Sequence, residues 1–312
     1  MFIVIRKIKS VLNNPFKVYM WATYTGAFKW VPDKIHLHLM YRASLKKKLN
    51  LSNPKTFNEK LQWLKLNDRN PLYTKLVDKY YVKQWVAQRI GSEYVTPTYA
   101  KWDNIDDIDI EELPERFVLK TNHDCGGVVI CNDRMHFDIE QAKELLKKHL
   151  SRNYYWGSRE WPYKNVNPVV FAEEYIEPDD SDLYDYKLFR FNNGRTITLV
   201  CTDRFSHAGL SKTFFDEEWN VLEMTEGDHS SNPDIPVPKY FEKMKDLANT
   251  LAAGIPFVRV DFYEAHGRLR FGEMTFYPNS GCEAFNPPEW DETFGSWINL
   301  PAHGCQKASS TV

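Results

Sequence analysis

The chain has 312 residues, of which 43% are hydrophobic, 26% charged and 15% aromatic. This composition excludes a disordered or fibrous protein, and the length allows a sizeable core in about two domains. The N-terminal apolar run, residues 2–5, is too short for a membrane span or for the core of a signal peptide. The five cysteines show no CxxC spacing. We therefore expect a reduced, cytoplasmic protein with neither a disulfide framework nor a cysteine-bound zinc ion.

The charge is distributed unevenly along the chain. The net charge of −2 gives no general sign of nucleic-acid binding. Residues 1–50, however, contain ten Lys or Arg residues and one acid, Asp33, so this segment carries +9 and the remainder carries −11. Apolar side chains are interleaved with the basic ones. Two accounts fit this pattern: a basic amphipathic helix that lies on an anionic membrane surface, or a solvated helix packed against the acidic remainder.

The first third of the chain is expected to be mainly helical. Residues 1–50 read as mostly helical, and a capping box that starts at Thr56 predicts a helix through about Asn67. A second helix is expected over residues 72–90. Its apolar stripe includes Lys83, a charge that would either snorkel to solvent or serve a functional site.

After residue 91 the pattern changes to strands. An acidic linker over residues 103–115 precedes them. The expected strands are 117–120, 128–131, 168–176, 186–191, 195–201, 257–264 and 268–275. Helices are expected over residues 138–150 and 239–253. This mixture is typical of an α+β protein with antiparallel hairpins in its second half.

The clearest cluster of chemically useful side chains lies within residues 258–281. A turn at residues 265–267 joins two strands, and alternation places Arg259 and Asp261 on one face. If residue 261 pairs opposite residue 271, Glu273 and Thr275 join that face. Paired carboxylates with oxygen-rich neighbours suit a Mg²⁺ ion that bridges nucleotide phosphates. The alternative is a solvated face with a cross-strand ion pair between Arg259 and Glu273.

A second candidate is the loop that follows Lys120. A lysine at the end of a strand can reach a phosphate as a point charge, and Gly126 and Gly127 let backbone N–H groups approach it. His123, in the same loop, could also touch a phosphate. The loop matches neither a Walker A motif nor a Rossmann fingerprint, and an ordinary hairpin turn is the alternative.

A third candidate is the segment 153–163, which has five aromatic residues and an adjacent pair, Arg159 and Glu160. Aromatic faces can stack on a sugar or a purine, but they can equally pack into a core. The sequence has no Gly-x-Ser-x-Gly elbow, and its histidines show no metal-binding spacing.

Taken in order, these segments resemble an ATP-grasp enzyme. They are most similar to the TupA-like ATP-grasp family, which is associated with the synthesis of teichuronopeptide and other bacterial surface polysaccharides. The resemblance covers about residues 50–301 and rests on NPKTFNEKLQWLKLNDRNPLYTKLVDKYYVKQWV (53–86), FVLKTNHDCGG (117–127), AEEYI (172–176), DYKLFRF (185–191), VRVDFY (258–263) and GEMTFYPNSG (272–281). It implies an α+β, ATP-grasp fold with a helix-rich N-terminal region and antiparallel sheets that flank the nucleotide site.

The resemblance also implies an order of segments. A basic helical N-terminal segment would occupy 1–50 and a helical region 51–115. The small ATP-grasp lobe would span 116–180, the large lobe with the metal site 181–305, and a tail 306–312.

The same resemblance implies roles for individual residues in binding ATP. Lys83 and Lys120 would contact phosphates, and the loop to Gly127 would cover them. Residues 173–176 resemble the hinge that reads adenine, and Asp185 is placed where an acid binds the ribose. The nucleotide-binding residues expected in this way are Lys83, Lys120, His123, Gly126, Gly127, Glu173, Glu174, Tyr175, Ile176, Asp185 and Lys187.

The metal ligands implied by the resemblance are Asp261, Glu273 and Thr275. The family usually has an asparagine at the third position, and the hydroxyl of Thr275 would replace it here. Arg259 resembles the arginine that stabilises the acyl-phosphate step, so Arg259 and Lys120 are the expected catalytic residues. The cofactors implied are ATP and Mg²⁺.

The activity that the resemblance implies is an ATP-dependent carboxylate–amine ligase, acting on a uronic acid or an amino acid destined for a surface glycan. One alternative is a glycosyltransferase, whose DxD-like candidate at residues 107–109 falls in the acidic linker. A second alternative is a non-catalytic glycan-binding module that uses the aromatic segment. No nucleic-acid partner is expected, and a peripheral membrane contact would involve residues 1–50.

Overall fold

The computed structural model describes residues 18–19, 22–23, 26–179, 183–202, 209–227 and 229–302. Most of the apolar and basic start of the expected N-terminal helix, and the expected tail at 306–312, lie outside these ranges. The described helices are α3 (Asp33–Leu45), α4 (Phe57–Asn67), α5 (Leu72–Leu76), α6 (Val82–Ile90), α7 (Ile139–Leu150), α8 (Tyr154–Ser158), α9 (Phe241–Leu251) and α10 (Glu289–Ser296). None of these helices has the length and apolar character that crossing a bilayer requires.

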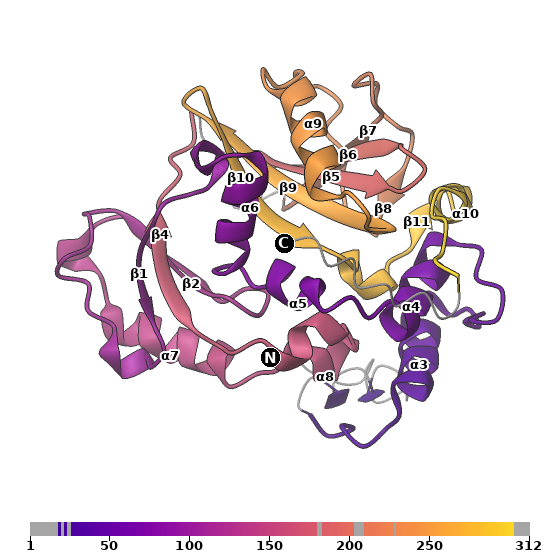
Figure 1. The fold of residues 1–312 in the computed structure, drawn as a ribbon, viewed down its shortest axis with the longest axis horizontal. Coiled ribbons are helices and arrows are strands. Elements are labelled where there is room, and N and C mark those ends of the chain that lie inside the picture. The colour runs from indigo at the N-terminus through magenta and orange to yellow at the C-terminus, as the bar shows by residue number, and fades with distance from the viewer. Residues whose placement is uncertain are drawn as a thin grey trace, which may run out of the picture.

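Two antiparallel sheets form the frame of the molecule (Figure 1). The small sheet has the order β1-β4-β2-β3, with β1 (Thr98–Trp102), β2 (Phe117–Thr121), β3 (Val128–Cys131) and β4 (Val170–Glu174). The large sheet has the order β10-β9-β5-β6-β7, with β5 (Asp185–Phe191), β6 (Thr196–Thr202), β7 (Ser211–Phe215), β9 (Phe257–Ala265) and β10 (Arg268–Thr275). A third, two-stranded sheet pairs β8 (Thr225–Glu226) with β11 (Phe285–Asn286). The expected mixture of helices and antiparallel strands is confirmed.

The small sheet buries one face and leaves the other for polar groups. Phe117 and Leu119 of β2 pack with Leu146 of α7 in a separate hydrophobic cluster. Because successive side chains of a strand alternate between faces, Lys120 of β2 points away from that cluster. Glu173 of β4 shares the polar face, since it pairs with Lys120 across the two strands. The small sheet includes β1, so it begins before residue 116, the expected start of the small lobe.

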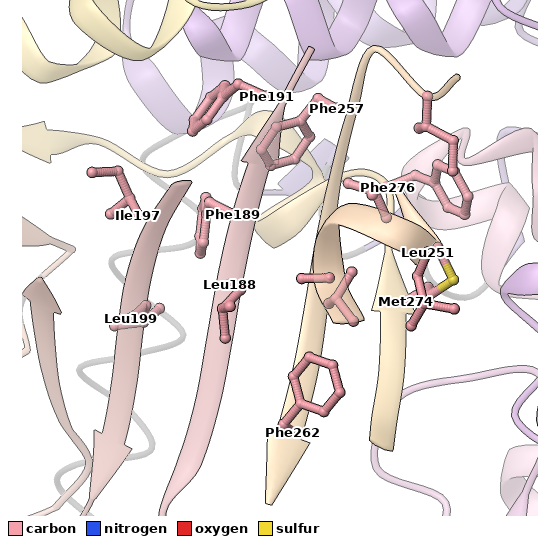
Figure 2. Packing of buried hydrophobic residues seen from close by; sticks show 14 of the residues in the cluster. Leu188, Phe189, Phe191, Ile197, Leu199, Leu251, Phe257, Phe262, Met274 and Phe276 are labelled. Atoms are coloured by element: carbon pink, nitrogen blue, oxygen red, sulfur yellow. The ribbon is translucent and has the colours of Figure 1, made fainter. Parts of the chain in front are cut away.

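One face of the large sheet is divided between an aromatic region and a polar one. In β5 and β9, Phe189 lies opposite Arg259, and Lys187 lies opposite Asp261, so these four residues share a face. Phe57 of α4 covers the aromatic end, with ring centroids 4.9 Å from Phe257. Figure 2 shows the aromatic side chains crowded at this end of the strands. The polar end of the same face carries Lys187, Arg259 and Asp261.

The prediction of a single helix over residues 72–90 is wrong, because this segment forms two helices, α5 and α6. Asp78 causes the break: its carboxylate accepts hydrogen bonds from the backbone N–H groups of Tyr80 and Tyr81, at 3.0 Å each. Such local side-chain bonds compete with helical ones and start a new helix. The capping box at Thr56 is confirmed, with α4 ending at Asn67 as expected.

The expected pairing of residue 261 with residue 271 is also wrong. Phe271 lies opposite Phe262, and the register shifts before Met274 lies opposite Val260. The two pairs differ by one residue, which is the signature of a β-bulge. The bulge brings Glu273 and Thr275 back to the face of Arg259, so the expected cluster forms through a bulge and not through regular pairing.

Candidate active site

A buried carboxylate joins two lysines on the polar face of the small sheet. Glu173 is 6% exposed and forms ion pairs with Lys120 and with Lys83, the latter at 2.6 Å. Lys83 also donates to the Thr98 hydroxyl at 2.7 Å and to the carbonyl of Thr96 at 3.0 Å. Lys83 is therefore not a snorkelling side chain. It lies within a fixed polar cluster that presents two ammonium groups on one carboxylate.

Electrostatics keep this cluster charged despite its burial. Burial alone would raise the pKa of Glu173, but Lys120 and Lys83 together lower that pKa below its usual value. Burial lowers the pKa of Lys83, and Glu173 partly offsets this effect. The side chain of Lys120 is 26% exposed, so it is the more accessible of the two ammonium groups.

The segment that follows β4 borders a pocket of about 320 Å³. Glu174, Tyr175 and Ile176 line one side, and the β9–β10 turn lines the other. Arg116 lies over the ring of Tyr175, with its guanidinium carbon 4.3 Å from the ring centroid. Of the expected hinge residues, Glu173 differs from the others because its side chain belongs to the lysine cluster.

The glycine loop between β2 and β3 is held by its own side chains. Asp124 is buried and contacts both the hydroxyl of Thr121 and the ring of His149 on α7. His123 is 2% exposed, and its Nε2 atom lies 3.0 Å from the carbonyl of Arg152. The side chain of His123 therefore faces inward, which leaves the backbone of the loop, not this ring, to meet a ligand.

Gly127 is required by this packing. A Cβ atom at that position would lie 1.9 Å from the Thr121 hydroxyl and 2.9 Å from a carboxylate oxygen of Asp124. We predict that Gly127→Ala lowers the free energy of unfolding by about 1–3 kcal/mol, the usual cost of overpacking. Adding Thr121→Ala removes the nearest obstructing atom. Chemical denaturation should therefore show that the double variant loses less unfolding free energy than the two single variants lose together. Losses that simply add would contradict this account.

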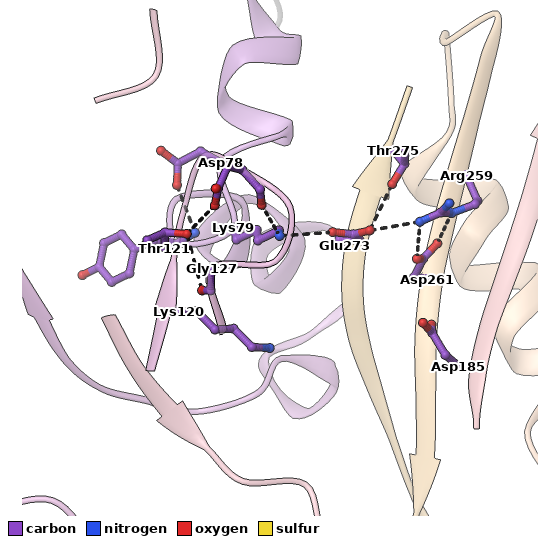
Figure 3. Close-up of polar contacts among 12 residues, drawn as sticks. Asp78, Lys79, Lys120, Thr121, Gly127, Asp185, Arg259, Asp261, Glu273 and Thr275 are labelled. Carbon is purple, nitrogen blue, oxygen red and sulfur yellow. Dashed lines mark hydrogen bonds and ion pairs between the residues drawn. The ribbon is translucent and has the colours of Figure 1, made fainter. Parts of the chain in front are cut away.

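The second polar cluster lies on the large sheet (Figure 3). Arg259 binds the Asp261 carboxylate through two nitrogen atoms, at 2.7 and 2.6 Å, and contacts Glu273 at 3.0 Å. Lys187 lies 2.5 Å from Asp261 and 2.5 Å from Asp185. The hydroxyl of Thr275 donates to Glu273 at 3.2 Å. The structure thus brings together the expected metal, ribose and acyl-phosphate residues.

Burial and charge oppose each other in this cluster. Burial would lower the pKa of Lys187, but Asp185 and Asp261 raise it above its usual value. Burial would raise the pKa of Glu273, whereas Lys79, Arg259 and Lys187 lower it to about 2. Lys187 and Glu273 are therefore both ionised near neutral pH, whereas burial raises the pKa of Asp261 against the opposing effect of Arg259 and Lys187.

The shifted pKa of Glu273 predicts a pH dependence of stability. A carboxylate whose pKa is depressed by folding stabilises the protein above its unfolded-state pKa of about 4.3, and that contribution is lost as the pH falls toward 2. We expect Glu273→Gln to remove it. The wild type should then exceed the variant in unfolding free energy by a constant amount from pH 7 to about pH 5, and this difference should shrink at lower pH. A constant difference at all pH values would contradict the shift.

Lys79 connects the glycine loop to the second polar cluster and was missed by the sequence analysis. Its ammonium donates to the carbonyl of Asp124 in the glycine loop at 2.6 Å and lies 3.7 Å from Glu273 on β10. Its backbone N–H also donates to the carbonyl of Asn122 at 2.9 Å. The available signal was the position of Lys79 directly after Asp78, the residue that breaks the helix. Figure 3 shows Lys79 reaching from the side of the glycine loop to Glu273 on β10.

The remaining sequence candidates lie elsewhere or serve packing. The aromatic residues of 153–163 are all buried or half-buried, and Arg159 is 1% exposed with bonds to backbone carbonyls. This burial supports a packing role for the segment, and Glu160 and Tyr163 also interact electrostatically with Arg259. In the DxD-like segment, Ile108 packs in the hydrophobic cluster of α7, on the face of the small sheet opposite Lys120.

The two antiparallel sheets, each with a polar cluster, agree with the ATP-grasp fold that the sequence predicts. The TupA-like ATP-grasp family matches residues 59–299, so the chain belongs to this family. The expected family and fold are confirmed by this match.

Solved structures with a similar arrangement share little sequence. D-alanine–D-alanine ligase from Helicobacter pylori is 11% identical, with a TM-score of 0.46, over 79% of this chain and 70% of that one. The ATP complex of the Bacillus anthracis D-alanine–D-alanine ligase is 15% identical, with a TM-score of 0.37, over 65% of this chain and 54% of that one. VanG D-Ala:D-Ser ligase from Enterococcus faecalis is 14% identical, with a TM-score of 0.41, over 65% and 52%. The chain thus spans about half the length of two of these enzymes. A search of curated proteins found no match.

Proposed function

We propose that the protein is an ATP-dependent carboxylate–amine ligase whose nucleotide binds between the two sheets. The observation that carries the proposal is a set of five cations and two carboxylates in which Lys79 joins the glycine loop of the small sheet to Glu273 of the large sheet. The cations are Lys79, Lys83, Lys120, Lys187 and Arg259, and the carboxylates are Asp261 and Glu273. The chain belongs to an ATP-grasp family, so we interpret these residues as a site for ATP and Mg²⁺.

In this proposal the small sheet binds the phosphates from one side. Lys120 has the more accessible ammonium group. Because Glu173 is shared between Lys83 and Lys120, its single negative charge does not fully neutralise Lys120. The backbone of the glycine loop covers the phosphates, with Gly126 and Gly127 allowing the approach. The segment 174–176 contacts the adenine beside the adjoining pocket. Asp185, placed by β5, binds the ribose, and Lys187 beside it binds a phosphate oxygen.

The donor set on the large sheet suits Mg²⁺. Asp261 and Glu273 contact the same nitrogen atom of Arg259, at 2.6 and 3.0 Å, so their oxygens converge, and Thr275 adds a hydroxyl. Within the described residues, no cluster of three or more His, Cys, Asp or Glu side chains could hold a metal by itself. Mg²⁺ usually takes one or two carboxylates and completes its shell with water and substrate phosphates, so two carboxylates are sufficient. When bound, the ion would neutralise charge on the phosphates.

The reaction would proceed in two steps. A carboxylate oxygen of the substrate attacks the γ-phosphorus of ATP, the bond to the β–γ bridging oxygen breaks, and ADP and an acyl phosphate form. An amine nitrogen then attacks the acyl carbon, phosphate leaves, and the amine loses a proton. Arg259 and Lys120 would stabilise the negative charge that the transferred phosphoryl group carries, by fixed electrostatic contacts.

The experiment that tests this proposal traps the acyl phosphate with hydroxylamine. The enzyme is incubated with MgATP, hydroxylamine and a panel of uronic acids and amino acids, and both ADP and hydroxamate are measured. We expect at least one carboxylate to give the two products in equal amounts. Transfer from a sugar nucleotide, with no carboxylate-dependent ADP release, would favour the glycosyltransferase alternative.

The biological role we propose is the synthesis of a bacterial surface polysaccharide such as a capsule, an O-antigen or a teichuronopeptide. The support for this role is the family to which the chain belongs. The carboxylate would then be a uronic acid or an amino acid, free or already joined to a glycan. A panel that yields hydroxamate only from carboxylates unrelated to glycans would contradict the role without affecting the ligase chemistry.

A further inference from the structure

Helix α3 is fixed to the protein through one face. Leu37 and Tyr41 are buried, and His36 is fully buried with its Nε2 atom 3.0 Å from the carbonyl of Gly157. Arg159 donates to the carbonyls of Phe28 and Val31, just before the helix. The opposite face of α3 therefore has a defined direction, toward solvent. Figure 1 places this helix at the periphery of the molecule, beyond α4 and α8.

The outward side of α3 and its flanks combines positive charge with exposed apolar groups. Trp30 is 78% exposed and Ile35 is 53% exposed. Lys34 and Arg42 lie on the helix, and Lys46 directly follows its last residue. We call this surface the basic face; its residues are Lys29, Trp30, Lys34, Ile35, Arg42, Lys46, Lys47 and Lys48, all of them exposed.

The basic side chains of the basic face are not held in ion pairs, although Lys47 is near enough to Asp291 to oppose the rise in the pKa of that carboxyl. Among the residues that the structure describes, none of its six basic side chains forms an ion pair with an acid. The one acid of this region, Asp33, turns inward, where it accepts from the Tyr155 hydroxyl at 2.6 Å and lies 3.2 Å from Arg159. Helix α3 thus packs against the rest of the protein with its basic side chains in solvent, and in the described part of the chain no ion pair joins them to the acidic remainder.

We propose that the basic face binds the surface of an anionic phospholipid membrane. Six exposed cations attract anionic headgroups, and the exposed Trp30 and Ile35 can enter the boundary between headgroups and acyl chains. A soluble polyanion would also attract the cations, but it offers no apolar layer for Trp30 and Ile35. The two exposed apolar side chains therefore favour a lipid surface. This inference does not depend on the proposed ligase activity.

The test uses the full chain and vesicles of pure phosphatidylcholine or of phosphatidylcholine with phosphatidylglycerol, in a flotation assay at low salt. We expect binding only to the anionic vesicles, with affinity that falls steeply as salt is added. Lys34→Gln with Lys46→Gln should weaken binding about tenfold or more, since each basic residue contributes appreciably near an anionic surface. The matched control is Lys147→Gln with Lys148→Gln, which removes two exposed charges from the last turn of α7.

A third variant separates lipid from other anions. Trp30→Ser with Ile35→Ser keeps every charge and should also weaken vesicle binding, while the melting temperature stays near that of the wild type. The proposal is overturned if anionic vesicles do not bind the wild type at low salt, or if the control variant loses as much binding as the α3 variant. It is also overturned if the Ser variant binds normally while polygalacturonate competes, because the face would then recognise a soluble polyanion.

Discussion

Glu273→Gln is expected to reduce MgATP-dependent ADP release by about 100-fold or more, the usual cost of removing one fixed electrostatic contact to a reacting phosphoryl group. Glu273 is one of the two proposed metal carboxylates, and a neutral amide binds Mg²⁺ poorly. The amide oxygen can still accept hydrogen bonds from Arg259 and from Thr275, which now contact the carboxylate at 3.0 and 3.2 Å. Turnover should therefore fall far more than stability.

The choice of Glu273 over Asp261 follows from their surroundings. Asp261 is 1% exposed and holds Arg259 and Lys187, so Asp261→Asn should abolish turnover but also break a buried ion pair, at a cost of about 3–5 kcal/mol. The Glu273 side chain is 35% exposed and less involved in folding. The control is Glu264→Gln on β9, the same change outside the cluster. ADP release by Glu273→Gln at the wild-type rate would refute the metal assignment.

Lys120→Ala is expected to weaken ATP binding by about 1.5–3 kcal/mol, which corresponds to roughly a tenfold to hundredfold higher Kd. Lys120 is the exposed partner of Glu173, and its loss removes a charge-assisted contact to a phosphate. Stability should change less, because Lys83 remains 2.6 Å from Glu173 and keeps that buried carboxylate paired.

Titration calorimetry with ATP tests this expectation. Two further variants serve for comparison, one expected to have little effect and one expected to lose stability as well as affinity. Lys101→Ala removes an ammonium that pairs with Asp103 at the surface of β1, so it should shift both affinity and stability by no more than about 0.5 kcal/mol. Lys83→Met should cost stability as well as affinity, since Lys83 also binds Thr96 and Thr98. Equal ATP affinity of Lys120→Ala and wild type would show that Lys120 is only a surface lysine.

The sequence was most informative where local rules dominate. The capping box at Thr56 depends on residues three apart, so the start of α4 could be predicted from the chain alone. Alternation along residues 257–265 placed Arg259 and Asp261 together because a strand has a fixed period of two. The predicted shared face of Arg259 and Asp261 was therefore correct, although the predicted pairing of residue 261 with residue 271 was wrong. A bulge near Gly272 is decided by packing, since a Cβ there would lie 3.0 Å from Tyr263.

Contacts between segments far apart in the chain could not be predicted from the sequence. The pairing of Lys83 with Glu173 joins residues 90 positions apart, and nothing in the pattern of either segment specifies it. The same holds for Lys79, whose partners lie in the glycine loop and on β10. Asp78 misled the helix prediction because periodicity records apolar spacing and does not register a side chain that bonds to the backbone two and three residues ahead.

The most direct test of the ligase account follows oxygen atoms from substrate to product. The carboxylate that gives hydroxamate is labelled with ¹⁸O in both oxygens and converted with ATP and an amine, and the products are analysed by mass spectrometry. If the carboxylate attacks the γ-phosphorus, one ¹⁸O appears in inorganic phosphate and one remains in the amide. Label in AMP would show attack at the α-phosphorus, and phosphate without label would exclude an acyl phosphate; either result would contradict the account.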